Sequence, residues 1–216
     1  MDISSRETDS DGWRIYRDGE TRYISVTTVL DYFVPQKLKN WFIKTNGEDV
    51  AKRKEETASK GSEIHDQAQQ GTEDRLNRLM EEMGITPKDK EFVVSSKNGW
   101  AGTVDLTAYL DGKLYLIDIK TGQFGHAALQ LAAYTLAHNE AGGGVEGNAV
   151  ISLPRDPTQP AKWFEYSAHM EQNQYAWACA FDVFKHAYYK KLLEWPCFEI
   201  KTVFQYNWSF NHGEPK

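Results

Sequence analysis

The sequence over residues 102–122, GTVDLTAYLDGKLYLIDIKTG, predicts a β-hairpin and with it the type of fold. Polar and apolar residues alternate from Gly102 to Leu110, which is typical of a strand with one buried face. Asp111-Gly112 is a strong signal for a tight two-residue turn. The stretch from Lys113 to Lys120 is then a second strand, largely apolar on both faces. Charged residues on so apolar a strand indicate a functional site.

Three charged side chains of this hairpin are expected to converge. A two-residue turn pairs Leu110 with Lys113, and the same register pairs Asp105 with Asp118. Directly opposed residues share a face of the sheet, with Cβ atoms about 5 Å apart. Lys120 lies two residues after Asp118 and therefore projects on that face too. The hairpin thus predicts two carboxylates and one ammonium group at a single point.

This combination of residue types suits metal-assisted hydrolysis of a phosphodiester. Two carboxylates that face each other repel unless a cation lies between them. Mg²⁺ accepts a few carboxylates together with waters and phosphate oxygens, and it can polarise a phosphodiester. A lysine beside it can orient or deprotonate the attacking water, or stabilise the developing charge. The alternative is a surface hairpin with an ordinary Asp-x-Lys ion pair.

Four further residues are candidates for the same site. His65 follows small residues near the start of a helix, and imidazole can ligate Mn²⁺ and, less readily, Mg²⁺. Glu91 begins the strand before the hairpin and is a candidate ligand. Gln130 and Tyr134 are four residues apart and share a helix face. Taken singly, the histidine is an ordinary helix residue, and the last pair an ordinary polar edge.

The rest of the chain predicts an α/β fold with a mixed central β-sheet flanked by helices and a helical N-terminal segment. The expected elements are a flexible segment 1–12, a hairpin of strands 13–16 and 22–25, a helix 29–33, helical stretches 36–54 and 57–83, strands 91–95, 102–110 and 113–120, a helix 126–138, strands 149–153 and 163–166, and a helix 170–193. We expect one domain over 13–216, divided into a helical segment 26–84, a core 85–194 and an aromatic tail 195–216.

Length and charge limit the function classes. A chain of 216 residues fits one domain, and its net charge of −6 argues against nonspecific coating of nucleic acid. Residues 36–60 nevertheless hold seven Lys or Arg against four Asp or Glu, which is either a local phosphate-binding surface or a solvated helix face. No apolar run approaches the length of a membrane span, and the N-terminal residues lack a secretory apolar core.

Together these residues resemble the RecB-like branch of the PD-(D/E)XK nuclease superfamily. That pattern consists, in order, of a Gly-x-x-x-His helix, an acid on an early strand, Gly-x-x-Asp, Asp-x-Lys-Thr and Gln-x-x-x-Tyr. The matching positions are Gly61 to His65, Glu91, Gly102 to Asp105, Asp118 to Thr121, and Gln130 with Tyr134. A weaker likeness over residues 25–28 and at Trp41 extends to phage exonucleases and mitochondrial genome maintenance exonucleases.

The resemblance implies a restriction-endonuclease-like core and a role for each residue. The implied ligands of a Mg²⁺ or Mn²⁺ ion are His65, Asp105, Asp118 and the backbone carbonyl of Ile119, with Glu91 as a further candidate. Lys120 would serve the catalytic water, while Gln130 and Tyr134 would contact the substrate or brace the site. Relatives with an iron–sulfur cluster carry four cysteines, whereas this chain has two, Cys179 and Cys197. Without a Gly-x-x-x-x-Gly-Lys-[Ser/Thr] motif, no ATP is expected either.

The resemblance also implies a metal-dependent DNA exonuclease that acts in phage DNA processing or recombination, in the cytoplasm of a bacterial host. Its partner would be DNA, single-stranded or with a free end, with a recombination or single-strand-binding protein as a further candidate and no membrane. Two alternatives stay open: a structure-specific or restriction-like endonuclease, and a DNA-binding module without cleavage. Six aromatic residues are either core or base-stacking groups: Trp163, Tyr175, Trp177, Tyr188, Tyr189 and Trp195.

Overall fold

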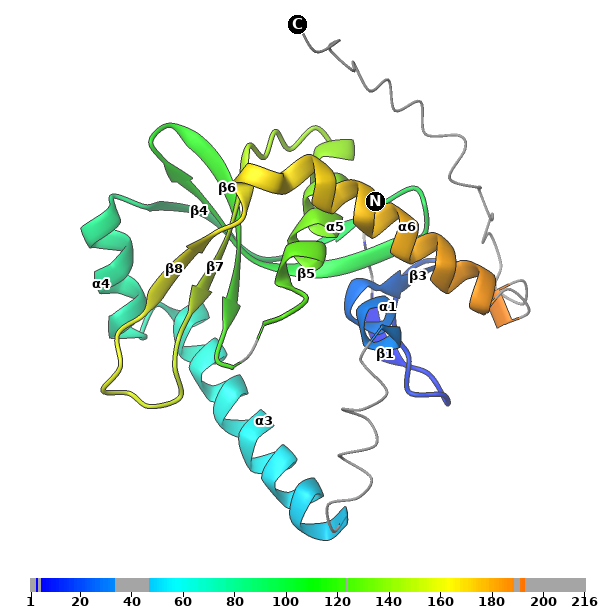
Figure 1. Ribbon diagram of the computed structural model, residues 1–216, viewed down its shortest axis with the longest axis horizontal. Coiled ribbons are helices and arrows are strands. Elements are labelled where there is room, and N and C mark those ends of the chain that lie inside the picture. Colours follow the sequence, from blue (N-terminus) through cyan, green and yellow to red (C-terminus); the bar gives the residue numbers. More distant parts are fainter. Residues whose placement is uncertain (1–2, 4, 34–46, 123, 189–190, 193–216) are drawn as a thin grey trace, which may run out of the picture.

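A mixed β-sheet forms the centre of the molecule (Figure 1). The computed structural model describes residues 3, 5–33, 47–122, 124–188 and 191–192, with side chains from residue 59 onward in the helix that begins at Gly47. Within these ranges the strands are β1 (Ser5–Thr8), β2 (Arg14–Asp18), β3 (Thr21–Ser25), β4 (Thr86–Ser95), β5 (Trp100–Leu110), β6 (Lys113–Lys120), β7 (Gly147–Ser152) and β8 (Lys162–Glu165). The helices are α1 (Val26–Tyr32), α3 (Gly47–Gln70), α4 (Asp74–Met83), α5 (Ala127–Glu140), the 3₁₀ turn η1 (Ser167–His169) and α6 (Met170–Ala187).

The strand order is β1-β2-β3-β5-β6-β7-β8, and β4 pairs with β5 outside this path. The β3–β5 and β6–β7 pairs are parallel, and the remaining pairs are antiparallel. Helices cover both faces, so the predicted α/β fold with a mixed central sheet is confirmed. The arrangement is consistent with a restriction-endonuclease-like core.

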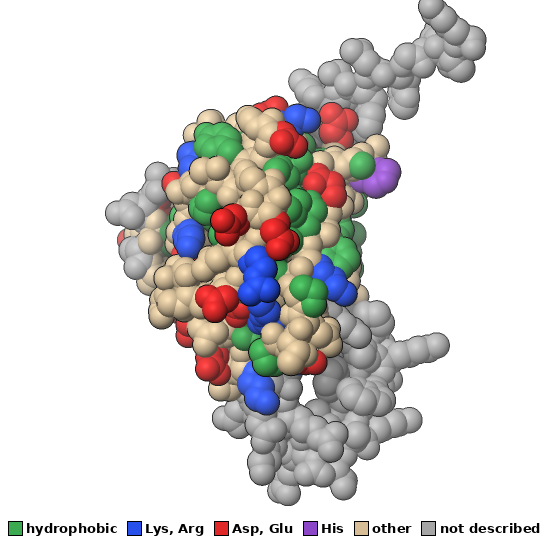
Figure 2. Space-filling model, turned by 90° about the vertical axis from the view of Figure 1, so that its left-hand side faces the viewer, with side chains coloured by type: hydrophobic (Ala, Val, Ile, Leu, Met, Phe, Trp, Pro, Cys, Tyr) green, Lys and Arg blue, Asp and Glu red, His purple; other side chains and the backbone are tan. Residues whose placement is uncertain are grey.

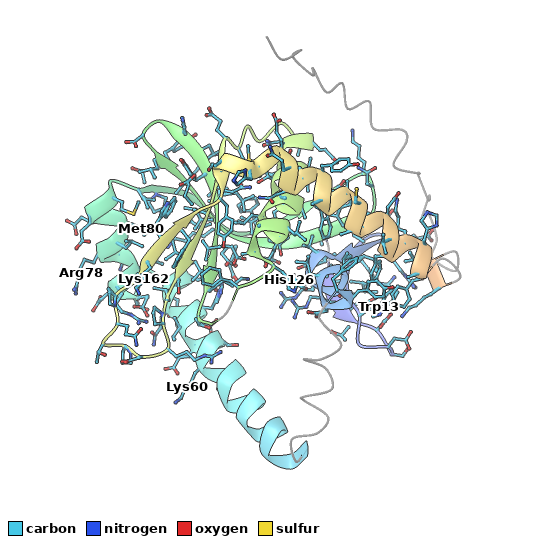
Figure 3. The ribbon with its side chains drawn as sticks, in the orientation of Figure 1. Trp13, Lys60, Arg78, Met80, His126 and Lys162 are labelled. Atoms are coloured by element: carbon cyan, nitrogen blue, oxygen red, sulfur yellow. The ribbon has the colours of Figure 1, made fainter. Side chains whose placement is uncertain are left out.

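Two hydrophobic cores lie on opposite faces of the sheet. On one face, α1, α5 and α6 pack around fully buried aromatic residues, with the rings of Trp100 and Trp177 5.6 Å apart. On the other face, Leu76 and Met80 of α4 and Ala68 near the end of α3 share a core with apolar residues of β6 and β7. Met80 is labelled in Figure 3. Because β6 is covered on both sides, its sequence is a nearly continuous apolar run rather than an alternating one.

The aromatic residues of α6 are partly core and partly surface. Trp177 is completely buried, as expected for a core residue, whereas Tyr175 is 45% exposed. Tyr189 and Trp195 lie outside the described residues, as do the tail 195–216 and Trp41. On the face that carries α4, acidic and basic side chains are interspersed (Figure 2), so this side of the described molecule offers no surface of a single charge.

The helix predicted over 57–83 is in fact two helices. Gly71 has a φ of +73°, a left-handed conformation that favours glycine, and it ends α3 one residue beyond Gln70. Glu73 then caps α4 by accepting a hydrogen bond from the backbone N–H of Arg75. The apolar periodicity continues across this break because both helices pack on the same face of the sheet, which is why it escaped the sequence pattern.

The N-terminal segment is also more ordered than predicted. We expected residues 1–12 to be flexible, yet Ser5–Thr8 form β1 and pair antiparallel with β2 at the edge of the sheet. The backbone provides this pairing, and Glu7 adds an ion pair with Arg17. A short polar segment without alternating apolar residues has no recognisable strand pattern, because its pairing at the sheet edge uses backbone groups alone.

Strand β4 begins at Thr86, five residues before the predicted start at Glu91. Its first part contains Pro87, which usually argues against a strand. Here the pairing with β5 shifts between Pro87 and Asp89, and β4 has a neighbour on one side only. An edge strand with a bulge tolerates a residue that cannot donate a hydrogen bond.

Candidate active site

The hairpin β5–β6 has the predicted register, but its ladder ends early. The pairs run from Leu110–Lys113 to Leu106–Ile117 and stop one step before Asp105 and Asp118. At its other end β5 pairs with β3, through Trp100 and Ala101. The two acids therefore lie where β6 separates from β5, and the backbone of the diverging strands becomes available to side chains.

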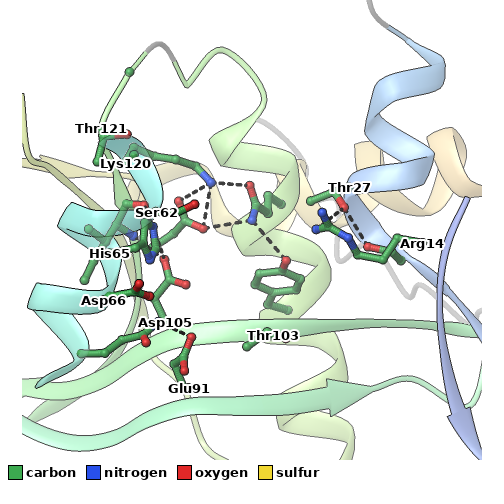
Figure 4. A pocket seen from close by; sticks show the side chains of 18 of the residues that line it. Arg14, Thr27, Ser62, His65, Asp66, Glu91, Thr103, Asp105, Lys120 and Thr121 are labelled. Carbon is green, nitrogen blue, oxygen red and sulfur yellow. Dashed lines mark hydrogen bonds and ion pairs between the residues drawn. The ribbon is translucent and has the colours of Figure 1, made fainter. Parts of the chain in front are cut away.

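The backbone of Ile119 is held by side chains in this opening. Its N–H donates to Oδ2 of Asp105 over 2.7 Å, and its carbonyl lies 2.8 Å from Nε2 of His65. A carbonyl oxygen can only accept, so Nε2 of His65 carries the proton in this arrangement. The same nitrogen is 3.8 Å from Oδ2 of Asp105. Side chains and backbone groups from β5, β6 and α3 thus meet at one place (Figure 4).

A second set of hydrogen bonds holds Asp118, which is 2% exposed. Nζ of Lys120 lies 2.8 Å from Oδ2 and 3.1 Å from Oδ1 of Asp118, and it also donates to Oε1 of Gln130 over 3.0 Å. The Gln130 amide nitrogen donates to Oδ1 of Asp118 over 2.9 Å and to the Tyr134 hydroxyl over 3.1 Å. The side chains of Gln130 and Tyr134 therefore lie on the same side of α5, which faces the site.

One oxygen of this set has an ion pair but no hydrogen bond. Although Lys120 is close to Oδ2 of Asp118, no donor reaches that buried oxygen with hydrogen-bond geometry among the described residues. The 2.8 Å contact with the Lys120 ammonium is therefore an ion pair that lacks the direction of a hydrogen bond. A buried carboxylate oxygen without a donor is costly unless a cation or water binds it.

Burial and like charge dominate the electrostatics of the site. Burial, followed by the negative charge of Asp118, raises the pKa of Asp105 to about 7, although His65 and the Ile119 N–H act in the opposite direction. Burial and the charge of Asp118 also raise the pKa of Tyr134 well above its usual value. The tyrosine is therefore a neutral hydroxyl, and a bound cation beside Asp105 would favour the ionised form of that carboxyl group.

The donor set fits a Mg²⁺ or Mn²⁺ ion held by few protein ligands. Among the residues described, no three His, Cys, Asp or Glu side chains are close enough to enclose a metal ion. Mg²⁺ does not need such a cage, since one or two carboxylates usually bind it together with waters and substrate phosphates. Asp105 and Asp118, whose Oδ2 accepts no hydrogen bond from the described residues, supply these carboxylates. His65 could serve as a ligand through Nε2 only after that nitrogen loses its proton and its hydrogen bond to the Ile119 carbonyl.

These residues line an open cavity of about 600 Å³. Glu91 lies on its wall in an unusual backbone conformation, with a φ of +45°, and accepts a hydrogen bond from Gln69. It stays a candidate ligand. Three arginines that sequence reasoning missed also line the cavity: Arg6, Arg14 and Arg155. They come from β1, β2 and the loop after β7, and no local motif marks them.

The basic stretch 36–60 cannot be placed against this cavity, since it lies largely outside the residues whose side chains are described. No helix in the described part of the chain is long and apolar enough to cross a membrane.

Neither a protein-family model nor a curated protein matches the chain. Among solved structures, it is similar to SSO0001, at 15% identity and a TM-score of 0.34, covering 73% of this chain and 74% of the other. It is also similar to an alkaline exonuclease, LHK-Exo from Laribacter hongkongensis, at 14% identity and a TM-score of 0.38, covering 78% and 92%. The complex of LHK-Exo with dAMP gives 18% identity and a TM-score of 0.33, covering 62% and 72%. Similarities at this level of identity and TM-score assign neither a family nor an activity to this chain.

Proposed function

We propose that the protein is a metal-dependent deoxyribonuclease that hydrolyses phosphodiester bonds from DNA ends, in DNA processing or recombination. The observation that carries this proposal is the meeting of Asp105, Asp118 and Lys120 where β6 leaves β5, with a buried Asp118 oxygen that accepts no hydrogen bond from the described residues. An isolated surface ion pair would not be buried against a second acid. The motifs that resemble the RecB-like nucleases contribute to one cavity, which supports the same reading.

Each side chain of the site would have a separate role in the hydrolysis. When bound, the metal ion would polarise the phosphodiester and lower the pKa of a water molecule. Asp105 and Asp118 would hold the ion, with His65 and the Ile119 carbonyl as further donors. The Lys120 ammonium, beside Asp118, can hold the attacking water or stabilise charge on the phosphate. Gln130 would keep the lysine and the aspartate in place, since its amide contacts both.

The cavity suits a strand that is held by its phosphates. It is open and lined by polar groups from several elements, with arginines on β1, β2 and the β7–β8 loop. Phosphate contacts position a strand without reading its sequence. A nuclease built in this way should require a DNA end more than a particular sequence, and added salt should weaken its binding steeply.

The test is digestion of linear and covalently closed circular plasmid with Mg²⁺, together with end-labelled single- and double-stranded oligonucleotides. We expect progressive loss of the linear DNA, survival of the circles, and no reaction with EDTA. Asp118→Asn should abolish the reaction while keeping the circular dichroism spectrum of the wild type. Rapid nicking of the circles would support a structure-specific or restriction-like endonuclease instead. Binding without any cleavage would support a non-catalytic DNA-binding module.

A further inference from the structure

Arg155 is a charged side chain on the cavity wall that the proposed chemistry does not use. It follows β7 in the loop to β8, is exposed, and lines the same cavity as the acids. Among the described residues, no hydrogen bond or ion pair involves its guanidinium group. We propose that Arg155 binds a phosphate of the DNA strand next to the one at the carboxylates. This proposal rests on the proposed nuclease function.

The position of Arg155 connects it to the catalytic strand. A Cβ atom added at Gly122 would lie 3.4 Å from Nη2 of Arg155, so the guanidinium group passes next to the backbone just beyond Lys120 and Thr121. This contact places a positive charge on the side of the cavity where β6 ends. A strand with one phosphate at the two acids would present a neighbouring phosphate to the cavity wall.

The loop that carries Arg155 is anchored on both sides of it. Nη1 of Arg75 donates to the carbonyl oxygens of Pro154, Asp156 and Gln159, over 2.7, 3.2 and 3.2 Å. The other nitrogens of Arg75 bind the carboxylate of Glu73, over 2.8 and 3.1 Å, and both side chains are largely buried. The backbone on either side of residue 155 is thus fixed to the start of α4, which limits the conformational entropy lost when a ligand binds.

Three other cations near the cavity have partners among the described residues, whereas Arg6 on β1, like Arg155, has no side-chain partner there. Lys120 is paired with Asp118, Arg75 is paired with Glu73, and Arg14 donates to the hydroxyl of Thr27. The N–H groups of the Arg155 guanidinium are therefore available to donate hydrogen bonds to a ligand. Its planar fork matches two phosphate oxygens, a geometry that lysine cannot reproduce. The chemistry of this position therefore favours a phosphodiester.

The experiment measures DNA binding and turnover for the wild type, Arg155→Ala and Arg155→Lys, with Arg78→Ala as a matched control. Arg78 is an exposed arginine on α4 away from the cavity lining (Figure 3). The Kd for a fluorescent oligonucleotide is measured with Ca²⁺ in place of Mg²⁺ over a range of NaCl concentrations. Arg155→Ala should weaken binding about tenfold and lower the salt slope by about one, as expected for the loss of one phosphate contact. Its KM with Mg²⁺ should rise while kcat changes little.

Three outcomes are distinguishable. Arg155→Lys should fall between the wild type and alanine, because it keeps the charge and loses the paired hydrogen bonds. If the wild type cleaves DNA and Arg155→Ala matches Arg78→Ala in Kd, KM and salt slope, the role of Arg155 is refuted while the nuclease stands. If the wild type neither binds nor cleaves DNA, the proposed function fails, and this inference fails with it.

Discussion

An alanine at position 102 would collide with the ring of Tyr134. An added Cβ would lie 2.2 Å from Cε1, 2.8 Å from Cζ and 2.9 Å from the hydroxyl oxygen, closer than real Cβ atoms approach. The ring has little room to move, since Tyr134 is 3% exposed and packs in the core shared by α1, α5 and α6. Gly102→Ala therefore overpacks the core directly beneath the site.

The expected effect is a loss of both stability and activity. Overpacking of a well-packed core costs about 1–3 kcal/mol, and a protein of this size loses about 2–4 °C in Tm for each kcal/mol, so the Tm should fall by about 2–12 °C. The hydroxyl of Tyr134 accepts a hydrogen bond from Gln130, whose amide also binds Asp118. A displaced ring would disturb that amide, and turnover should fall by up to about 10²-fold.

Thermal unfolding and initial rates of DNA hydrolysis measure these two effects. Gly125→Ala is the matched control, because an added Cβ there meets no atom within 4 Å and it should leave both values nearly unchanged. Tyr134→Ala removes the ring that the added Cβ would meet. In a Tyr134→Ala protein, Gly102→Ala should therefore lower the free energy of unfolding by less than about 0.5 kcal/mol, because the two residues are energetically coupled through their contact. Tyr134→Phe keeps the ring and should keep the full penalty. A Gly102→Ala protein with the Tm of the wild type, or a penalty that persists without the ring, would refute this reasoning.

Three further predictions concern ionisable groups of the site and of the loop anchor. Burial and the charge of Asp118 give Asp105 a higher pKa in the folded than in the unfolded protein, so without metal the wild type should lose stability as pH rises from about 4 to 7. Asp105→Asn should not show this loss of stability. In chemical denaturation with EDTA at pH 8, its free energy of unfolding should exceed that of the wild type by on the order of 2–4 kcal/mol. Lys120→Ala should bind DNA normally but turn over about 10²-fold more slowly, and a lower Tm with normal specific activity would return the lysine to a structural ion pair. Arg75→Ala should destabilise the protein by about 3–5 kcal/mol, because the buried carboxylate of Glu73 loses its partner. The hydrogen bond from Arg75 lowers the pKa of Glu73, so the stabilisation by this ion pair is complete above the ordinary pKa of 4.5 and is lost as pH falls below it. The wild type and Arg75→Ala should therefore differ less in unfolding free energy in acid, and a difference that stays constant would contradict this prediction.

Local chemistry in the sequence was sufficient for the hairpin and for the general fold. The Asp111-Gly112 turn sets which residues of β5 and β6 face each other, and the observed pairs follow that register. The four-residue spacing of Gln130 and Tyr134 places both on one face of α5 because of the helix period. Alternation of helical and strand patterns was enough to predict a mixed sheet covered by helices.

The tertiary structure decided those features that the strand and helix periodicities of the sequence do not encode. The β5–β6 ladder ends at Leu106–Ile117, which leaves the Ile119 N–H to the carboxylate of Asp105, and this follows from the way the whole sheet twists and pairs. The break at Gly71 and the strand Ser5–Thr8 depend on which surfaces the rest of the chain presents. Arg155 lines the cavity from a loop that is held by Arg75, eighty residues earlier in the chain. Contacts of this kind join parts of the chain that share no local pattern, so they exist only once the sheet and its helices have assembled.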